Sequence, residues 1–400
     1  MDNPRLKIGD IVDVSTERLA YGGEAVARHN GLAVFIPFAA PGERLRVRIT
    51  ERKKNFARAV IDQILEPSPS RREAPCHYFG DCGGCQLQHL TYAAQLEAKA
   101  GFVRDAIERI ARIDWPHEIK IRHAAEFGYR GRAQVKLDRK TGSVGFNRAA
   151  SNAVCDVVSC PILVPELDDA LRSLRGAFVS ATLEDHLLPN RSQIDFAAGE
   201  SGVSFDPAFQ GLPGGVLQRS VNGAVYHFSA STFFQANPGL LDELVDEAVG
   251  SDSGEVAIDL YAGVGLFTIQ LARRFRRVIG VEADRGAATF ASENITANGL
   301  ANVEFKNDVV EAWMKGFVET EAQPPDLIVL DPPRTGAAEA VNHIVAAQPS
   351  RITYISCDPP TLARDLRTLV DSGYELTKVT TIDLFPQTYH VETIAALVRR

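Results

Sequence analysis

The sequence has no apolar run that approaches the roughly 20 residues needed to span a bilayer. Residues 1–10 are polar and hold no apolar signal core, and the chain has no internal repeat or low-complexity tract. We therefore expect a cytoplasmic protein without a membrane anchor. In that compartment its six cysteines are not expected to form disulfides. The length of 400 residues, with 45% hydrophobic and 24% charged content, predicts an ordinary globular protein of two or three domains.

Charge is unevenly distributed along the chain. The net charge of −8 argues weakly against a nucleic-acid ligand, but residues 1–72 carry thirteen Lys and Arg against nine Asp and Glu. Residues 120–148 carry eight basic and two acidic side chains. Local basic patches decide phosphate binding more than the total charge does. Both stretches are candidate RNA-binding surfaces. Either stretch taken alone fits the solvated face of a strand equally well.

The spacing of apolar residues divides the chain into three regions. Residues 5–66 alternate with period two between turn signals about ten residues apart, which predicts a small barrel of the oligonucleotide-binding kind. A helical pattern covers 92–113, and 120–235 reads mostly as strands, with one helix after Pro165. From residue 242 the pattern alternates between helix and strand, which predicts a doubly wound α/β sheet. Its expected strands are 255–260, 277–282, 302–306, 326–331, 352–356, 375–382 and 393–399.

A glycine turn and a series of acids indicate a cofactor pocket in this α/β region. Gly263 and Gly265 follow the strand 255–260, and small residues let the backbone approach a ligand closely. No third glycine completes the dinucleotide fingerprint. Glu282 ends the next strand, where a carboxylate can bind ribose hydroxyls, and Asp308 follows the third strand, within reach of an adenine amino group. The series favours an S-adenosylmethionine-dependent methyltransferase over a dehydrogenase.

Two further strands of the same sheet end in chemically distinctive residues. Asp331-Pro332-Pro333 follows one of them, and Cys357 follows another. Ligands of open α/β sheets bind outside the carboxyl ends of the strands. The sequence therefore predicts a thiol nucleophile beside the cofactor pocket.

The remaining cysteines form a different pattern. Cys76, Cys82 and Cys85 lie close together around Gly83-Gly84, and Cys160 is followed by Pro161, as in the Cys-Pro that ends the cysteine run of bacterial ferredoxins. Four thiolates can hold a [4Fe–4S] cluster or a tetrahedral zinc. Cys155 is an alternative fourth ligand or a spare thiol.

Together these motifs resemble the RNA uracil-C5 methyltransferase family, the 5-methyluridine enzymes of rRNA and tRNA. Residues 5–66 resemble a TRAM domain, and residues 76–89 resemble the iron–sulfur segment of the rRNA-modifying branch. Residues 231–237 resemble the start of the cofactor site. Residues 356–359 and 390–393 resemble the motifs that carry the nucleophile and the base.

The resemblance implies a role for each matching residue. Cys357 would be the nucleophile and Glu392 the proton acceptor. The presence of a barrel and a cluster implies rRNA, most readily 23S rRNA, because the tRNA branch generally lacks both. Leu266 stands where some members have a cofactor-binding asparagine, so that contact is not carried over to this chain. S-adenosylmethionine would contact Gln235, Tyr261, Glu282, Asp308 and Asp331, and the [4Fe–4S] cluster would be bound by Cys76, Cys82, Cys85 and Cys160.

Uracil C5 is a poor nucleophile, which explains why the chemistry needs a thiol. Addition of a thiolate at C6 makes C5 nucleophilic, and a base must then remove the C5 proton so that the thiolate can leave. The target base must also leave its stack to reach the thiol. The sequence does not identify what deprotonates Cys357.

Three domains and three competing functions follow. We expect a TRAM barrel over 1–68, a central RNA-binding domain with the cluster over 69–230, and the catalytic domain over 231–400, in a monomer. A tRNA uracil-C5 methyltransferase remains an alternative. So does an exocyclic-amine methyltransferase, which shares the Asp-Pro-Pro turn but needs no cysteine, and so does a non-catalytic RNA-binding or assembly factor.

Overall fold

The computed structural model describes residues 6–179, 193–209, 211–321 and 323–400. Residues 1–5 of the predicted barrel domain and 180–192 of the predicted central domain lie outside the described residues. Within the described part, no helix is long and apolar enough to cross a membrane. Internal contacts divide the chain into two compact units, which are described separately. The first comprises Met1–Phe102, Phe146–Val157 and Phe385–His390, and the second comprises Val103–Gly145, Val158–Leu384 and Val391–Arg400.

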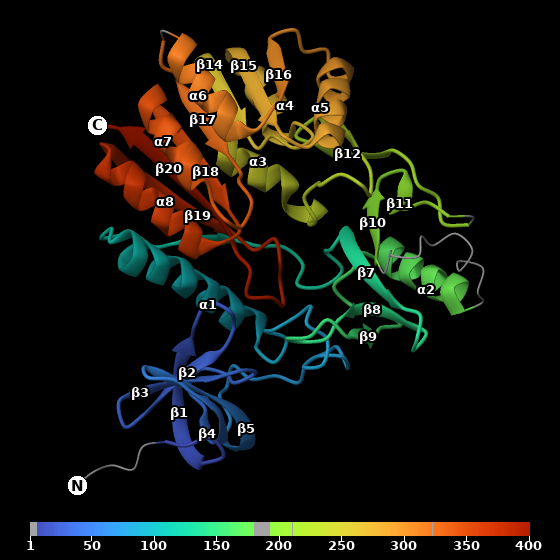
Figure 1. The fold of residues 1–400 in the computed structure, drawn as a ribbon, viewed down its shortest axis with the longest axis vertical. Helices are drawn as coiled ribbons and strands as arrows, with labels where there is room; N and C mark the ends of the chain where they lie inside the picture. Colours follow the sequence, from blue (N-terminus) through green and yellow to red (C-terminus); the bar gives the residue numbers. More distant parts are fainter. Residues whose placement is uncertain (1–5, 180–192, 210, 322) are drawn as a thin grey trace. The chain divides into compact units, whose positions relative to one another are not determined.

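Five short strands of the first unit close into a barrel with the order β1-β2-β3-β5-β4 (Figure 1). Alternating residues such as Leu45, Val47 and Ile49 point into its core. Asn30 and Gly31, with φ of 51° and 81°, form the tight turn between two strands, where positive φ matches the twist of a hairpin. The predicted barrel is confirmed. Its strands are β1 (Ile11–Leu19), β2 (Ala25–His29), β3 (Leu32–Ile36), β4 (Arg44–Arg52) and β5 (Phe56–Glu66).

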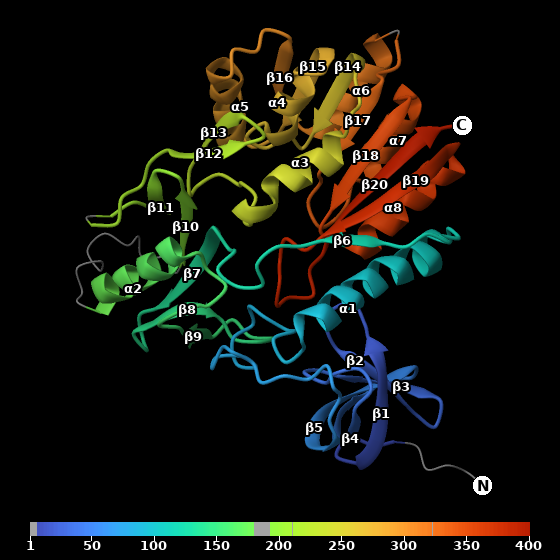
Figure 2. The ribbon, with the colours of Figure 1, turned by 180° about the vertical axis from the view of Figure 1, so that it is seen from behind.

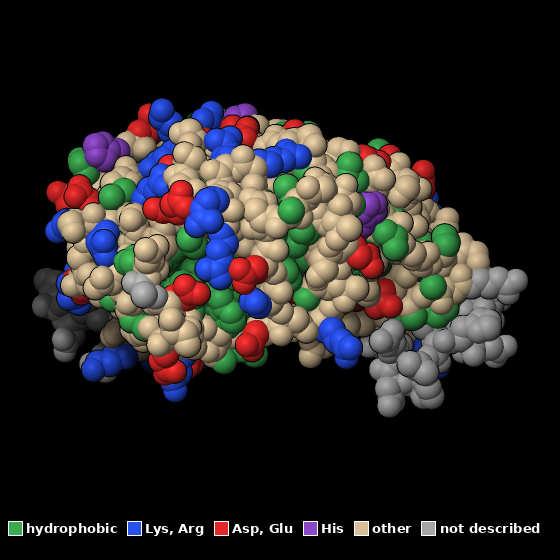
Figure 3. All heavy atoms as spheres, turned by 90° about the horizontal axis from the view of Figure 1, so that it is seen from above, with side chains coloured by type: hydrophobic (Ala, Val, Ile, Leu, Met, Phe, Trp, Pro, Cys, Tyr) green, Lys and Arg blue, Asp and Glu red, His purple; other side chains and the backbone are tan. Residues whose placement is uncertain are grey.

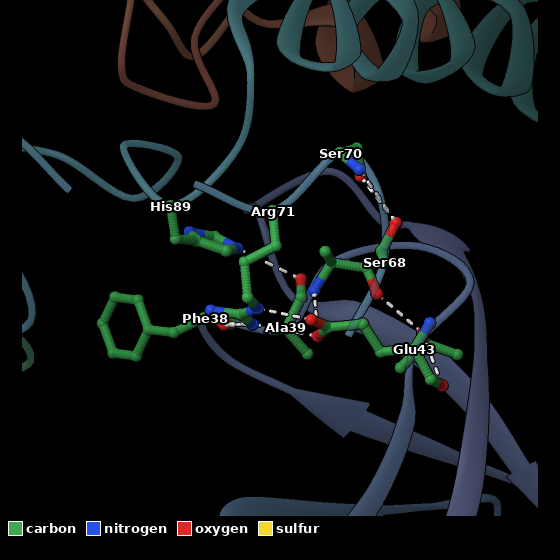
Figure 4. Close-up of polar contacts among 9 residues, drawn as sticks. Phe38, Ala39, Glu43, Ser68, Ser70, Arg71 and His89 are labelled. Carbon is green, nitrogen blue, oxygen red and sulfur yellow. Dashed lines mark hydrogen bonds and ion pairs between the residues drawn. The ribbon is translucent and has the colours of Figure 1, made fainter. Parts of the chain in front are cut away.

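A buried ion pair ties the chain that follows the barrel back onto it (Figure 4). The carboxylate of Glu43 is fully buried and accepts hydrogen bonds from Ala40 N at 2.8 Å and from the Arg71 guanidinium. Arg71 Nη2 also donates to the Phe38 carbonyl at 2.8 Å. Burial acts to raise the pKa of Glu43, but Arg71 and the backbone donors hold it below its usual value. The carboxylate is therefore stabilised in its charged form.

The end of the cysteine-rich segment packs on the same side of the barrel. His89 is buried, and its Nε2 donates to the Ala39 carbonyl at 3.2 Å (Figure 4). Phe79 stacks on the His89 ring at 5.7 Å between centroids and meets Phe38 edge-on. Burial lowers the pKa of His89 to about 4, so the ring is neutral near physiological pH. The segment 76–89 is thus joined to the barrel by packing as well as by sequence.

A loop from the far end of the chain completes the first unit. Gln387 is buried, and the side chain of Gln95 both accepts from Gln387 N and donates to Gln387 Oε1, each at 3.0 Å. The backbone N–H groups of Gln86 and Leu87 donate to the Gln387 carbonyl. Lys99 Nζ donates to the Phe385 carbonyl at 2.9 Å. Residues almost three hundred positions apart therefore satisfy one another's buried polar groups.

An eight-stranded sheet dominates the second unit, with the order β16-β15-β14-β17-β18-β20-β19-β6 (Figure 1). The five strands from β16 to β18 are parallel, β20 is antiparallel to both of its neighbours, and β6 joins parallel to β19 at the edge (Figure 2). The predicted doubly wound sheet is confirmed. Its strands are β6 (Lys120–Arg122), β14 (Gly254–Leu260), β15 (Phe275–Glu282), β16 (Val303–Asn307), β17 (Leu327–Leu330), β18 (Arg351–Ser356), β19 (Tyr374–Ile382) and β20 (Glu392–Arg399).

Helices cover both faces of this sheet. Alternate strand residues, such as Leu260, Leu330 and Tyr354, share one core with α6, α7, α8 and η1, while α3, α4 and α5 pack on the other face. α1 contributes Phe102 to the barrel core, and the chain beyond it joins the core of the sheet. The helices are α1 (Tyr92–Asp105), η1 (Ala106–Ala111), η2 (Pro238–Leu240), α3 (Leu241–Val249), α4 (Leu266–Ala272), α5 (Arg285–Ala297), α6 (Val310–Thr320), α7 (Ala338–Ala347) and α8 (Pro359–Asp371).

The middle of the chain forms two small antiparallel sheets and one further helix, as the predicted β-rich region requires. One sheet has the order β11-β10-β7-β8-β9, and the other pairs β12 with β13. The elements are β7 (Arg132–Asp138), β8 (Ser143–Asn147), β9 (Val154–Asp156), α2 (Pro165–Val179), β10 (Gln193–Gly199), β11 (Gly202–Asp206), β12 (Leu217–Val221) and β13 (Ala224–Phe228).

Candidate active site

Three neighbouring parallel strands end side by side at one edge of the eight-stranded sheet. The register pairs Leu260 of β14 with Leu330 of β17, and Leu330 with Tyr354 of β18. Tyr261 and Asp331 follow directly, and Cys357 follows the last residue of β18, so all three emerge at the same edge, where α/β sheets bind their ligands. The structure brings the predicted cofactor turn and the predicted nucleophile together.

Glu392 faces Cys357 from the antiparallel neighbour β20. Ser356 pairs with Thr393, so the next residues outward, Cys357 and Glu392, lie opposite one another. Opposite residues of an antiparallel pair have Cβ atoms about 4.5–5.5 Å apart. The Glu392 side chain is buried, at 3% exposure, and within the described residues its Oε1 has no hydrogen-bond partner. Burial, and then the charge of Asp331, raise the pKa of Glu392 well above its usual value.

Arg334 supplies the positive charge at this site. Burial raises the pKa of the Cys357 thiol to about 12, and the charges of Glu392 and Asp331 add to the rise. The charge of Arg334 and a side-chain hydrogen bond from it oppose the rise. Arg334 is thus the group that stabilises a thiolate here, and sequence reasoning missed this role. The signal was present as the residue that follows Asp-Pro-Pro, but its proximity to Cys357 depends on the fold.

A shallow hollow lies at this edge of the sheet, with Asp331 in its lining. Phe233, Gln235, Tyr261, Gly263 and Asp331 contribute to its lining. Gln235 Nε2 donates to Asp331 Oδ2 at 3.2 Å, which orients both side chains. Tyr261 has a φ of +61°, an unfavourable value for a residue other than glycine, and its hydroxyl donates to Glu311 Oε1 at 2.6 Å. Three of the five predicted cofactor residues therefore line one hollow.

The other two predicted cofactor residues lie at the ends of the next strands. Glu282 ends β15, where its Oε2 accepts from Gly263 N at 2.8 Å and its Oε1 from Asp284 N at 2.7 Å. Each carboxylate oxygen keeps a lone pair that can accept a ligand hydroxyl. Asp308 follows β16, is exposed and donates its own backbone N–H to the Glu282 carbonyl at 3.1 Å. Both acids stand at the carboxyl edge, outside the lining of the hollow.

A buried acid beneath the hollow was not predicted. Asp259, the penultimate residue of β14, is completely buried and accepts a hydrogen bond from Thr268 Oγ1 at 2.5 Å. Burial raises its pKa to about 7. Burial, together with the charge of Asp259, also raises the pKa of Asp331 to about 7. With Glu392, three carboxyl groups gather in poorly solvated surroundings, an arrangement that a cationic ligand would stabilise.

Comparison with known proteins agrees with this arrangement. A family model described as tRNA (Uracil-5-)-methyltransferase matches residues 216–400, and a TRAM domain model matches residues 5–61. A 23S rRNA (uracil(1939)-C(5))-methyltransferase, RlmD, of Cronobacter sakazakii is 35% identical, with 99% of this chain and 98% of that protein covered. The chain belongs to the RNA uracil-C5 methyltransferase family. An uncharacterized RNA methyltransferase of Aquifex aeolicus is 34% identical, with 96% of this chain and 97% of that protein covered.

A solved structure shares the fold of this RNA methyltransferase. It is the Pyrococcus abyssi tRNA (uracil-54, C5)-methyltransferase in complex with S-adenosyl-L-homocysteine, which matches with a TM-score of 0.72 at 24% identity and covers 96% of this chain and 100% of its own. At that identity the likeness establishes the architecture alone.

The four cysteines predicted to bind a cluster are divided between the two units, with Cys76, Cys82 and Cys85 in the first and Cys160 in the second. The charge of Cys76 acts, after burial, to raise the pKa of Cys82, whose sulfur accepts the Gly84 N–H at 3.4 Å. Cys155 is buried, and its thiol donates to Asp81 Oδ2 at 3.5 Å. The backbone N–H of Cys160 donates to Asp168 Oδ1 in the first turn of α2. No group of three or more His, Cys, Asp or Glu in the described ranges is arranged to hold a metal ion.

Much of the positive charge predicted to bind RNA is paired within the protein. Arg132, for example, donates to the carbonyls of Ser229, Ala230 and Thr232. On the face drawn in Figure 3, basic and acidic side chains likewise lie interspersed. Exposed pairs contribute little to stability, but they reduce the local positive potential. Such pairs join Arg44 to Glu66, Arg46 to Asp13, Arg48 to Asp62, Arg122 to Glu247 and Arg148 to Asp81.

Proposed function

We propose that this methyltransferase modifies C5 of a specific uridine in 23S rRNA and takes the methyl group from S-adenosylmethionine. Family membership supports the reaction, and relatives named as 23S rRNA enzymes at 33–35% identity support the substrate. The observation that carries the mechanism is the pairing of Cys357 with Glu392 at the carboxyl edge of the sheet, with Arg334 against the thiol.

The hollow at the carboxyl edge of the sheet suits the proposed methyl donor. Gln235, Tyr261 and Asp331 line it, and Glu282 and Asp308 at the neighbouring strand ends are positioned for ribose and adenine. The buried carboxyl groups favour a cationic ligand because a positive charge would offset their desolvation. When bound, S-adenosylmethionine supplies an electrophilic methyl group on a sulfonium.

Cys357 would begin the reaction on the RNA. Its thiolate forms a bond to C6 of the extruded uracil, and the electron pair of the C5–C6 double bond becomes available at C5. Arg334 would stabilise the thiolate against the burial and the acidic neighbours that raise the pKa of the thiol. C5 would then form a bond to the methyl carbon as the methyl–sulfur bond of the donor breaks, which leaves a neutral thioether.

Glu392 would complete the reaction. Its carboxylate removes the proton from C5, the double bond re-forms, and the C6–S bond breaks to release the Cys357 thiolate. The raised pKa of Glu392 suits this step, because a more basic carboxylate takes a proton from carbon more readily. The buried position also excludes water, which would compete for the proton.

A deletion strain tests the function. Mass spectrometry of rRNA and tRNA should show loss of 5-methyluridine at one 23S rRNA position, restored by the wild-type gene and not by Cys357→Ala. Loss in tRNA instead would establish the tRNA alternative. Activity retained by Cys357→Ala would favour exocyclic-amine methylation, and purified protein that binds RNA but not labelled S-adenosylmethionine would favour the non-catalytic reading.

The [4Fe–4S] cluster predicted at Cys76, Cys82, Cys85 and Cys160 needs its own test. The interaction of Cys76 with Cys82 and the Gly84 N–H···S contact support a thiolate site in this segment, while the described residues assemble no complete ligand set. Iron and sulfide analysis of protein purified without oxygen should give four of each per chain if the prediction holds. Zinc, or no metal, would overturn it.

A further inference from the structure

The turn that carries Arg334 is held by one helix. This turn, residues 331–337, joins β17 to α7, and α8 starts two residues after Cys357. Asp365, in the middle of α8, is 1% exposed. Its Oδ2 accepts from Ala337 N at 2.8 Å and from the Tyr354 hydroxyl at 2.7 Å, and its Oδ1 accepts from Arg364 Nε at 2.8 Å. A buried carboxylate with three donors is a well-satisfied and rigid anchor.

Two more side chains of α8 bind the backbone of the same turn. Thr361 Oγ1 lies 3.2 Å from the Arg334 carbonyl and shares its single proton between that oxygen and Asp358. Arg364 Nη2 donates to the Thr335 carbonyl at 3.0 Å. The approach is so close that a Cβ on Gly336, whose φ is +75°, would clash with the Arg364 guanidinium and come within 2.7 Å of the Asp365 carboxylate. The turn and the helix therefore have one tight fit.

Asp365 connects the chain segment that carries Arg334 to the strand that precedes Cys357. Tyr354 lies three residues before Cys357 on β18, and Ala337 lies three residues after Arg334. A single carboxylate, that of Asp365, thus fastens the ends of both chain segments. The Arg334 side chain is itself exposed, so burial does not fix its direction. Its direction depends on the backbone that α8 holds.

We propose that Asp365 and Thr361 are positioning residues, which hold the Arg334 turn against Cys357 and so make the thiol reactive. Neither residue would touch the RNA or the methyl donor. The proposal rests on the proposed roles of Cys357 and Arg334, but it can be tested without RNA.

The test is the rate at which iodoacetamide alkylates Cys357 in the full-length protein at a fixed, mildly alkaline pH. Mass spectrometry of the peptide that contains Cys357 separates this rate from those of the other cysteines. Besides Arg334, the charged groups that face the thiol are Glu392 from β20 and Asp331 from the turn. Those groups stay unchanged in Thr361→Val and Asp365→Asn. Thr361→Val keeps the shape of the side chain, Thr361→Ser restores the hydroxyl, and Thr368→Val alters an exposed threonine two turns further along α8.

We expect Thr361→Val and Asp365→Asn to slow alkylation by about tenfold, equivalent to a rise of about one unit in the pKa of the thiol. Thr361→Ser and Thr368→Val should match the wild type. In an Arg334→Gln background, Thr361→Val should have no further effect, because the anchor acts through Arg334.

Two results would overturn the proposal. One is wild-type alkylation in folded Thr361→Val, and the other is an equal slowing by Thr361→Val with and without Arg334. If Asp365→Asn does not fold, as judged by circular dichroism, the Thr361 variants decide alone. Failure of the wild type to methylate RNA while the alkylation pattern holds would refute the proposed function and leave the anchor standing.

Discussion

Replacement of Glu392 by glutamine should separate the two halves of the proposed reaction. Glutamine keeps the size and hydrogen-bonding shape of the side chain but cannot take a proton from C5. Methyl transfer would still occur, but the thiolate could not leave. We expect Glu392→Gln to accumulate a covalent complex between Cys357 and the methylated RNA.

The magnitudes of the two effects differ. Loss of a positioned general base typically costs about 10²–10⁴-fold in rate, and this loss falls on the release step. The addition step should not be slowed, because Glu392 acts to raise the pKa of the Cys357 thiol. Unit charges about 5 Å apart interact by roughly 3 kcal/mol at an effective dielectric constant of 20, which is about two pKa units. That value is an upper limit, because the charge of Arg334 at the same site partly offsets that of Glu392.

A denaturing gel measures the outcome directly. Protein, RNA and S-adenosylmethionine are mixed, and the fraction of protein that migrates with RNA is followed over time. Wild type should show a transient complex, and Glu392→Gln a nearly stoichiometric one. Glu375→Gln, which changes an exposed carboxylate on β19, should behave as wild type.

Two results would refute this reasoning. Normal turnover without a trapped complex would remove Glu392 from the reaction. A complex that persists in the double variant Cys357→Ala/Glu392→Gln would show that the RNA is not attached through Cys357.

Three further predictions rest on single features. Binding of S-adenosylmethionine, measured by calorimetry, should strengthen as pH rises through about 7, because Asp331 then ionises beside a cationic ligand, and Asp331→Asn should flatten this dependence. Gly336→Ala should lower the melting temperature by circular dichroism and slow Cys357 alkylation, since the added Cβ meets α8 in a backbone conformation that only glycine adopts readily. As pH falls from about 6.5 to about 4, the free energy of unfolding of the barrel should fall by roughly 3 kcal/mol, because His89 binds a proton in the unfolded chain but not in the folded barrel. Urea denaturation, followed by hydrogen exchange of barrel peptides, measures this fall, which should be smaller in His89→Gln.

The regular parts of the fold could be predicted because local patterns specify them. The strands around Leu260, Leu330 and Tyr354 are apolar runs, followed by a glycine turn, an acid-Pro-Pro sequence and a cysteine. In the structure each of these strands begins within about two residues of its predicted start. Strands were expected beyond residue 120, but the place of β6 in the eight-stranded sheet was not predicted, since its three residues carry no period and depend on pairing with β19. The predicted helix over 92–113 ends instead in a π-helical turn, which stops at Arg112 with a φ of 56°.

The site was predictable in its motifs and not in its supporting contacts. Cys357 and Glu392 stand in recognisable segments, although their roles remain predictions. The roles of Arg334 and Asp365 could not be predicted. Arg334 follows the Asp-Pro-Pro motif, but only the fold brings it to Cys357, and Asp365 is buried in the middle of an ordinary amphipathic helix. Charge counts also misled, since Arg132 in the basic stretch is occupied by backbone carbonyls.

The loop at Gln387 has a consequence for biosynthesis. Its hydrogen bonds with Gln95 join residues 292 positions apart, and both partners lie in the first unit. At about 5–20 residues per second, the ribosome needs roughly 15 to 60 seconds to make the chain between them. During that time the side chains of Gln95 and Lys99 lack the hydrogen bonds that the loop later provides. The part of the protein that is made first therefore cannot finish folding until the strand that carries Glu392 is about to leave the ribosome.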